Sequence, residues 1–138
     1  EHKDWYEKLS EERGVGERFN FRGYVEEEEL VKSYQDCDVF VIPSDTETLG
    51  LVALEAMACR TPVIGANAKG LKHIISHGED GLLFSPRAVS ELSEHVIKLL
   101  KDEELRKEMG RNARKKAEKF SAERVGKRWI DFYSKILK

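Results

Sequence analysis

The sequence predicts a single α/β domain with a parallel sheet, flanking helices and a helical C-terminal end. Two continuous apolar segments end at residues 43 and 66, helical patterns separate them, and only helical patterns follow residue 88. Continuous apolar runs are typical of strands buried on both faces. Strands that alternate with helices imply parallel pairing through right-handed crossovers. A chain of 138 residues suffices for one core and is short for two.

The first part of the chain is expected to form a helix, a strand and a second helix. Residues 2–13 have helical spacing of their apolar side chains and are followed by two glycines. Residues 18–25 alternate two phenylalanines with polar residues, which predicts a short strand. Residues 26–37 carry acids in their first turn, where the helix dipole favours them.

The middle of the chain alternates strands and helices. The segments DVFVIP, PVIGA and GLLF predict strands buried on both faces, at 38–43, 62–66 and 81–84. Between them, helices are expected at 49–59 and 70–76. The remainder, from residue 88, predicts three helices with breaks near Gly110 and at Phe120-Ser121. We therefore place the α/β part in residues 1–100 and the C-terminal helices in 101–138.

Composition predicts a soluble, cytoplasmic protein. The longest apolar runs are about a dozen residues, shorter than the ~20 that span a bilayer, and no charged-then-apolar leader opens the chain. Cys37 and Cys59 lack the spacing of a zinc or redox site and are interpreted as reduced structural thiols. Glu and Lys total 33, against three Asn and one Gln, a balance typical of hyperthermophiles.

The C-terminal region is basic. Residues 101–138 carry 13 basic and 7 acidic side chains. Because the two signs alternate along expected helices, the pattern indicates a solvated surface, and no nucleic-acid partner is expected. The basic charge is also compatible with contact to an anionic membrane surface, although no motif supports such contact.

The segment PSDTETLGLVALEAMACRTPVIG, residues 43–65, predicts a ligand site. It follows the carboxyl end of a strand, where helix N-termini attract phosphate, and its glycine at 50 permits close approach. Glu47 and Glu55 are suited to accept ligand hydroxyl groups. The alternative is that Glu47 is a solvated loop acid and Glu55 a core acid bonded to a backbone amide. Four residues are expected to cap the following helix: Ser44, Asp45, Thr46 and Thr48.

The same segment, with Glu47 and Glu55 eight positions apart, resembles the Glu-x7-Glu signature of retaining glycosyltransferases of the GT-B fold. These enzymes are the glycosyl transferases group 1, which include the family-four sugar transferases. FNFRGYV, ELVKSYQDCDVFVIPS and GLKHIISHGEDGLLFSP are similar to the segments on either side. The resemblance covers about residues 1–120. It implies a Rossmann-like donor-binding domain whose parent transfers a hexose from a nucleotide diphosphate sugar.

The resemblance also implies roles for particular residues. The catalytic residue is Glu47, which meets hydroxyls of the transferred sugar, and Glu55 binds the ribose of the nucleotide. The remaining expected donor-binding residues are Thr48, Leu49, Gly50 and Leu51 beside sugar and diphosphate, Tyr24 and Val25 beside the base, and Lys69 beside the diphosphate. No metal and no other cofactor is expected.

Two residues depart from the family pattern. Arg60 occupies the position of a glycine after the EAMAC helix, and a left-handed conformation there costs a non-glycine residue about 1 to 2 kcal/mol, so the helix is expected to end differently. Lys69 occupies one position of a customary Gly-Gly pair, where a phosphate-facing loop is altered or gains positive charge.

The family's first two donor-domain strands and its N-terminal acceptor domain have no counterpart in these residues. The strand expected at 18–25 would then pair with DVFVIP, with a second chain, or with the rest of a longer enzyme. The chain by itself is expected to be inactive. The alternatives are a non-catalytic module that binds nucleotide or nucleotide sugar, a sugar-nucleotide epimerase of the same fold, and a structural domain without ligand.

Overall fold

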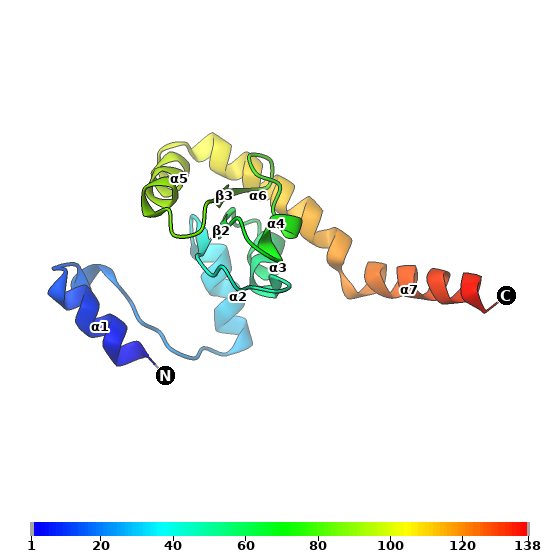
Figure 1. The fold of residues 1–138 in the computed structure, drawn as a ribbon, viewed down its shortest axis with the longest axis horizontal. Coiled ribbons are helices and arrows are strands. Elements are labelled where there is room, and N and C mark those ends of the chain that lie inside the picture. Colours follow the sequence, from blue (N-terminus) through cyan, green and yellow to red (C-terminus); the bar gives the residue numbers. More distant parts are fainter. Residues whose placement is uncertain (1, 138) are drawn as a thin grey trace. The chain divides into compact units, whose positions relative to one another are not determined.

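The computed structural model describes residues 2–137 (Figure 1). The chain divides into two compact units, residues 1–30 and residues 31–138. Helix α2, Glu27–Asp36, includes residues of both units. Each of its ends lies within one residue of the helix predicted at 26–37. Among the described residues, no helix is long and apolar enough to cross a membrane.

The first unit contains helix α1, Lys3–Glu12, as predicted, and a short 3₁₀ helix η1, Gly16–Arg18. The strand predicted at 18–25 is wrong. Phe19 has extended backbone angles, and its ring stacks on that of Phe21 with centroids 5.6 Å apart, so the alternation persists. A strand also requires a neighbour for its N–H and C=O groups, and no described residue pairs with this segment.

The second unit is built on a three-stranded parallel sheet, which confirms the predicted α/β class. Its strands are β1 (Phe40–Ile42), β2 (Val63–Ala66) and β3 (Gly81–Phe84), in that spatial order. Each lies inside one of the three strand segments read from the sequence. The helices are α3 (Leu51–Ala58), α4 (Leu71–Ile74), α5 (Val89–Lys101), α6 (Glu103–Ala117) and α7 (Ala122–Ile136), with a 3₁₀ turn η2 (Glu118–Phe120) before α7.

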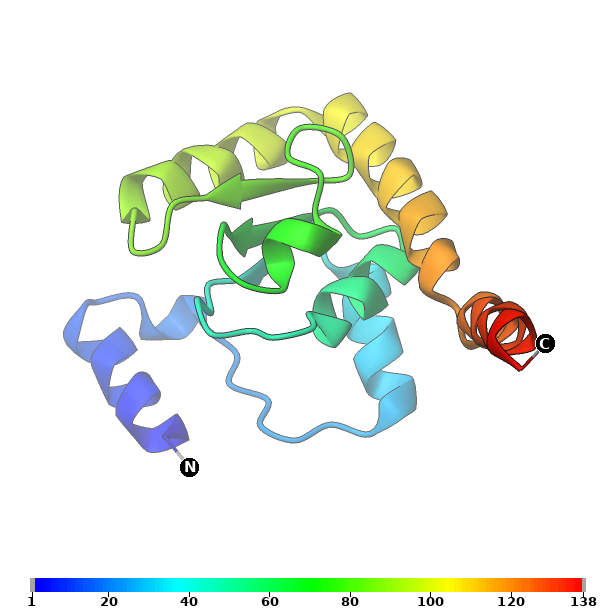
Figure 2. The ribbon, with the colours of Figure 1, turned by 45° about the vertical axis from the view of Figure 1, so that its right-hand side comes forward.

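Helices cover both faces of the sheet (Figure 2). Successive side chains of a strand point to opposite faces. Ile64 and Leu82 therefore pack with Leu99 and Met109 on the α5 and α6 side. On the other face, Gly65 leaves so little space that an added Cβ would lie 2.8 Å from the Cδ1 of Ile75, just after α4. Burial on two faces explains why the strand segments are apolar without alternation.

The expectation of full burial is met by β2 and fails for β1. All four residues of β2 are buried, whereas in β1 only Ile42 is buried. β2 is central, whereas β1 has a described strand neighbour on one side only. β3 is also at an edge, yet three of its four residues are buried, so edge position alone does not explain the exposure of β1. A continuous apolar run of sequence does not distinguish these two positions.

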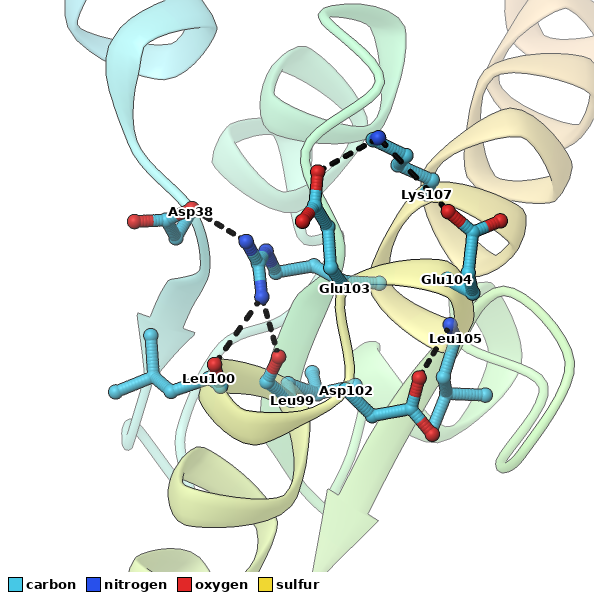
Figure 3. A network of polar contacts seen from close by, with 9 residues as sticks. Asp38, Leu99, Leu100, Asp102, Glu103, Glu104, Leu105 and Lys107 are labelled. Carbon is cyan, nitrogen blue, oxygen red and sulfur yellow. Dashed lines mark hydrogen bonds and ion pairs between the residues drawn. The ribbon is translucent and has the colours of Figure 1, made fainter.

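The first break between the C-terminal helices lies at Asp102, so the break predicted near Gly110 is wrong. The Asp102 carboxylate accepts a hydrogen bond from the Leu105 N–H at 2.9 Å and caps α6. Arg106 donates to the Leu99 carbonyl at 2.8 Å and pairs with Asp38 at 3.0 Å, which ties this corner to the residues before β1 (Figure 3). The second predicted break, at Phe120-Ser121, is confirmed.

Helix α3 ends in a left-handed residue, as it would with glycine. Arg60 has φ 66°, its N–H donates to the Met57 carbonyl at 3.0 Å, and the Thr61 N–H donates to the Ala56 carbonyl at 3.1 Å. These two hydrogen bonds define a Schellman motif. The expectation that Arg60 changes the end of the helix is therefore wrong, and the arginine carries the conformational cost instead.

Replacing Arg60 by glycine should stabilise the second unit by about 1 kcal/mol, because glycine adopts positive φ without a Cβ penalty. Arg60→Ala is the matched control, since it removes the same long side chain and keeps the Cβ. Urea unfolding followed by circular dichroism measures both variants. A glycine variant no more stable than the alanine variant would contradict the explanation.

Candidate functional site

Two loops meet at the carboxyl edge of the sheet. One follows β1 and contains Glu47 and Thr48, and the other follows β2 and contains Lys69 and Gly70. The Gly70 N–H donates to the Glu47 carbonyl at 2.9 Å. An added Cβ on Gly70 would lie 2.3 Å from the Thr48 carbonyl oxygen, so only glycine fits this contact. The fold thus brings together residues 22 positions apart, at the edge where parallel α/β sheets bind ligands.

Gly50 begins helix α3 with φ 75°, a left-handed conformation. An added Cβ there would also lie 2.9 Å from the Cδ1 of Ile74 in α4. The sequence favoured this glycine for close approach of a ligand. The structure adds a second reason, which is that α4 packs directly against the start of α3.

The Glu47 side chain is hydrogen-bonded to the backbone just before α3. Its Oε1 accepts hydrogen bonds from the N–H groups of Gly50, at 2.9 Å, and Leu49, at 3.2 Å. These two donors, Gly50 first, lower the pKa of Glu47, so the group is ionised at neutral pH. Within the described chain, no hydrogen bond to Oε2 is found, and this oxygen can accept from a ligand hydroxyl.

The cap expected from the serine, threonine and aspartate residues of this loop is wrong. The residue at the N-cap position is Gly50, which has no side chain and makes no side-chain cap, and the Glu47 side chain bonds forward to the N–H of this glycine. Ser44 instead accepts a hydrogen bond from the Thr46 N–H at 3.3 Å within the loop. The sequence pattern located the helix start to within two residues but predicted a side-chain cap that α3 does not have.

Glu55 lies on the exposed side of α3. The buried side of the helix is formed by Ala53, Ala56 and Met57, which explains why the surrounding sequence is apolar. Its Oε2 accepts a hydrogen bond from the Tyr34 hydroxyl at 3.2 Å. The alternative that Glu55 is a core acid bonded to a backbone amide is therefore wrong.

A groove of about 300 Å³ lies beside Glu55, between α3 and the end of α6. Its lining includes Arg114 and Phe120. The Arg114 guanidinium is held by Glu118, with its Nε 3.0 Å from Oε1, and donates to the Ala58 carbonyl. The groove therefore offers an apolar wall and one fixed, paired cation next to the Glu55 carboxylate.

The remaining predicted site residues have the following positions. Lys69 is exposed and has φ 38°, a positive value where the family pattern has glycine. Tyr24 and Val25 belong to the first unit, and the Tyr24 side chain is 88% exposed. The second unit holds all the other predicted site residues.

The sequence did not identify Tyr34 as a site residue. It lies 21 positions before Glu55 on a different helix, with its side chain 6% exposed. A tyrosine near the end of an amphipathic helix gives no local signal of a polar contact to a later helix, so only the tertiary structure reveals this contact.

The arrangement defines a class of ligand. The first hydrogen bond within α3 is made by the Ala53 N–H to the Gly50 carbonyl at 3.0 Å, so the amides of Leu51 and Val52 precede it and are oriented outward for an anion. Glu47, in the loop before α3, and Glu55, on α3 itself, add acceptors for hydroxyl groups. The fold and site are those of α/β proteins that bind phosphorylated, hydroxyl-rich ligands such as nucleotides.

Comparison with known proteins identifies the family. Residues 1–116 match the family model of glycosyl transferases group 1, and the chain belongs to this family. Over 132 residues it is 36% identical to an uncharacterized glycosyltransferase of Methanocaldococcus jannaschii, MJ1607. The matched region covers 95% of this chain and 34% of that protein.

Two solved structures are similar. The C-terminal domain of a glycosyl transferase group 1 family protein, LpcC, from Francisella tularensis matches with a TM-score of 0.74 and 29% identity, over 83% of this chain and 59% of that one. Anabaena Alr3699/HepE in complex with UDP-glucose matches with a TM-score of 0.85 and 25% identity, over 96% of this chain and 37% of that one. The fold is that of a GT-B C-terminal domain.

The chain spans about a third or less of the length of the curated relatives it matches first. It corresponds to one part of each of these relatives.

Proposed function

We propose that this chain binds the donor of a glycosyltransferase, a nucleotide diphosphate sugar, and that the parent enzyme transfers the hexose of this donor to an acceptor with retention of configuration. The observation that carries the proposal is the start of α3, where outward backbone amides lie between two carboxylates that suit hydroxyl groups. The family supports it, as does the binding of UDP-glucose by the similar Anabaena protein.

Each residue has a proposed role. Glu47 accepts hydroxyls of the transferred sugar through Oε2, since Oε1 already accepts hydrogen bonds from the N–H groups of Leu49 and Gly50. Glu55 accepts the ribose hydroxyls. The diphosphate lies against the segment Thr48–Leu51 and the Lys69 ammonium group. For Tyr24 and Val25, contact with the base is proposed from the family resemblance alone. No metal is required, because helix amides and the lysine neutralise the diphosphate.

Replacing Glu55 by glutamine should weaken the binding of UDP by roughly 1.5 to 3 kcal/mol, about 10- to 150-fold, because a charge-assisted hydrogen bond to ribose becomes a neutral one. The matched control is Glu108→Gln on α6, an exposed glutamate outside the proposed site. Isothermal titration calorimetry with UDP measures the affinity of both variants, and circular dichroism measures their melting temperatures.

Two results would contradict the proposal. Equal affinity of the Glu55→Gln and unaltered chains, with a lowered melting temperature, would make Glu55 a structural acid. The absence of saturable UDP binding by the unaltered chain would remove the donor-binding function altogether.

A further inference from the structure

We propose that Tyr34 is a positioning residue that holds the Glu55 carboxylate in the orientation that accepts the ribose hydroxyls. The inference rests on the proposed function, because it assigns Tyr34 to the same donor site. It adds a residue from a different helix, α2, whose contact with Glu55 links two segments 21 positions apart.

Tyr34 is itself firmly held. Its side chain is 6% exposed, and its ring meets the ring of Phe40 edge to face, with centroids 5.3 Å apart and an interplanar angle of 87°. Its carbonyl accepts hydrogen bonds from the Thr61 hydroxyl and, at 3.4 Å, from the Cys37 thiol. Contacts to the ring and to the backbone therefore fix where the phenol oxygen lies.

In the contact between Tyr34 and Glu55, the tyrosine is the hydrogen-bond donor and the carboxylate is the acceptor. Burial, and next the charge of Glu55, raise the pKa of Tyr34 to about 12, so the hydroxyl keeps its proton and acts as the donor. It donates to Oε2 of Glu55 at 3.2 Å. The other carboxylate oxygen, Oε1, has no hydrogen bond from the described residues, and a carboxylate has about four acceptor positions in all.

Glu55 needs such a partner because its side chain lies on the exposed surface of α3. A free glutamate samples several rotamers, and a ligand that binds it must stop this motion at a cost in entropy. A hydrogen bond from an immobile phenol removes part of that cost before the ligand arrives. Losing the hydroxyl should therefore weaken binding without removing any ligand contact.

A double-mutant cycle tests the inference, with UDP as the probe. Tyr34→Phe keeps the ring and removes the donor, and it should weaken UDP binding about three- to tenfold. In the Glu55→Ala background, the same change should have no further effect, because the group that Tyr34 orients is gone. Tyr133→Phe on α7, an exposed tyrosine, is the matched control and should leave the affinity unchanged.

A second measurement does not depend on the folding of the Tyr34 variant. In the unaltered chain, NMR should detect a Tyr34 hydroxyl proton that exchanges slowly with water, and Glu55→Ala should make this exchange faster.

The outcomes separate the two proposals. If Tyr34→Phe leaves UDP affinity unchanged while Glu55→Ala weakens it, the positioning role is wrong and the donor site stands. Equal losses from Tyr34→Phe in both backgrounds would show that Tyr34 acts through packing instead of through Glu55. If the unaltered chain binds no UDP, the donor-binding function fails and the positioning role fails with it.

Discussion

Replacing Gly110 by alanine should destabilise the second unit by roughly 2 to 3 kcal/mol, although alanine is the better helix former. Gly110 lies inside α6, where an added Cβ would be 2.2 Å from the Arg60 carbonyl oxygen and 3.2 Å from its carbon. Both atoms belong to the backbone at the end of α3, so no side chain can rotate away. The two helices must separate, which disturbs the packing of α6 against the helix that carries Glu55.

Gly126 provides the control for this substitution. It lies inside α7, and an added Cβ would meet no atom within 4 Å. Gly126→Ala should therefore stabilise the helix by about 0.5 to 1 kcal/mol. Urea unfolding of the two variants measures the difference. A Gly110→Ala protein as stable as the Gly126→Ala protein would show that α6 does not approach α3 as closely as the structure has it.

The 138-residue polypeptide, assayed by itself, should transfer no sugar. Transfer requires an acceptor held against the donor sugar, and loss of this positioning removes about 7 to 11 kcal/mol of rate advantage. The chain covers about a third of its relatives, so it is expected to retain the donor site and to lack acceptor contacts. Weak binding of nucleoside diphosphate, micromolar to millimolar, should remain.

A radiolabelled nucleotide diphosphate sugar, incubated with the purified chain and a panel of acceptors, checks this expectation. Glu47→Ala is the control, because it removes the carboxylate proposed to meet the sugar. Labelled product formed by the unaltered chain and abolished in the Glu47→Ala chain would contradict the prediction, and would show that a complete active site forms in this short polypeptide.

Some features of the fold could not be predicted from local sequence, because they depend on residues far away in the chain. The extended segment around Phe19 and Phe21 has the alternation of a strand, but strand formation depends on a partner that the local sequence does not encode. The position of Gly110 inside a helix is explained only by the carbonyl of Arg60, 50 residues earlier. A glycine in a helical pattern indicates either a break or a close approach, and the neighbour decides between them.

The sequence likewise predicted only part of the candidate site. The residues from Glu47 to Glu55 were predicted from one contiguous segment, and the reason is local, because a strand, a turn and a helix start follow one another within a few residues. The contacts of these residues could not be predicted from the segment alone. Glu47 uses one oxygen to accept from the backbone just before α3, and Glu55 lies on the exposed side of its helix. Both arrangements depend on how the surrounding elements pack.

By itself, the sequence determined the α/β class, the order of strands and helices around the parallel sheet, and the segment that carries the proposed donor site, because periodicity and motif spacing are local properties of the chain. The tertiary structure alone decided the contact between Tyr34 and Glu55 and the backbone contact between Gly70 and Thr48. Both contacts join residues more than 20 positions apart, and their existence depends on how helices and loops pack across the sheet, which no local pattern specifies.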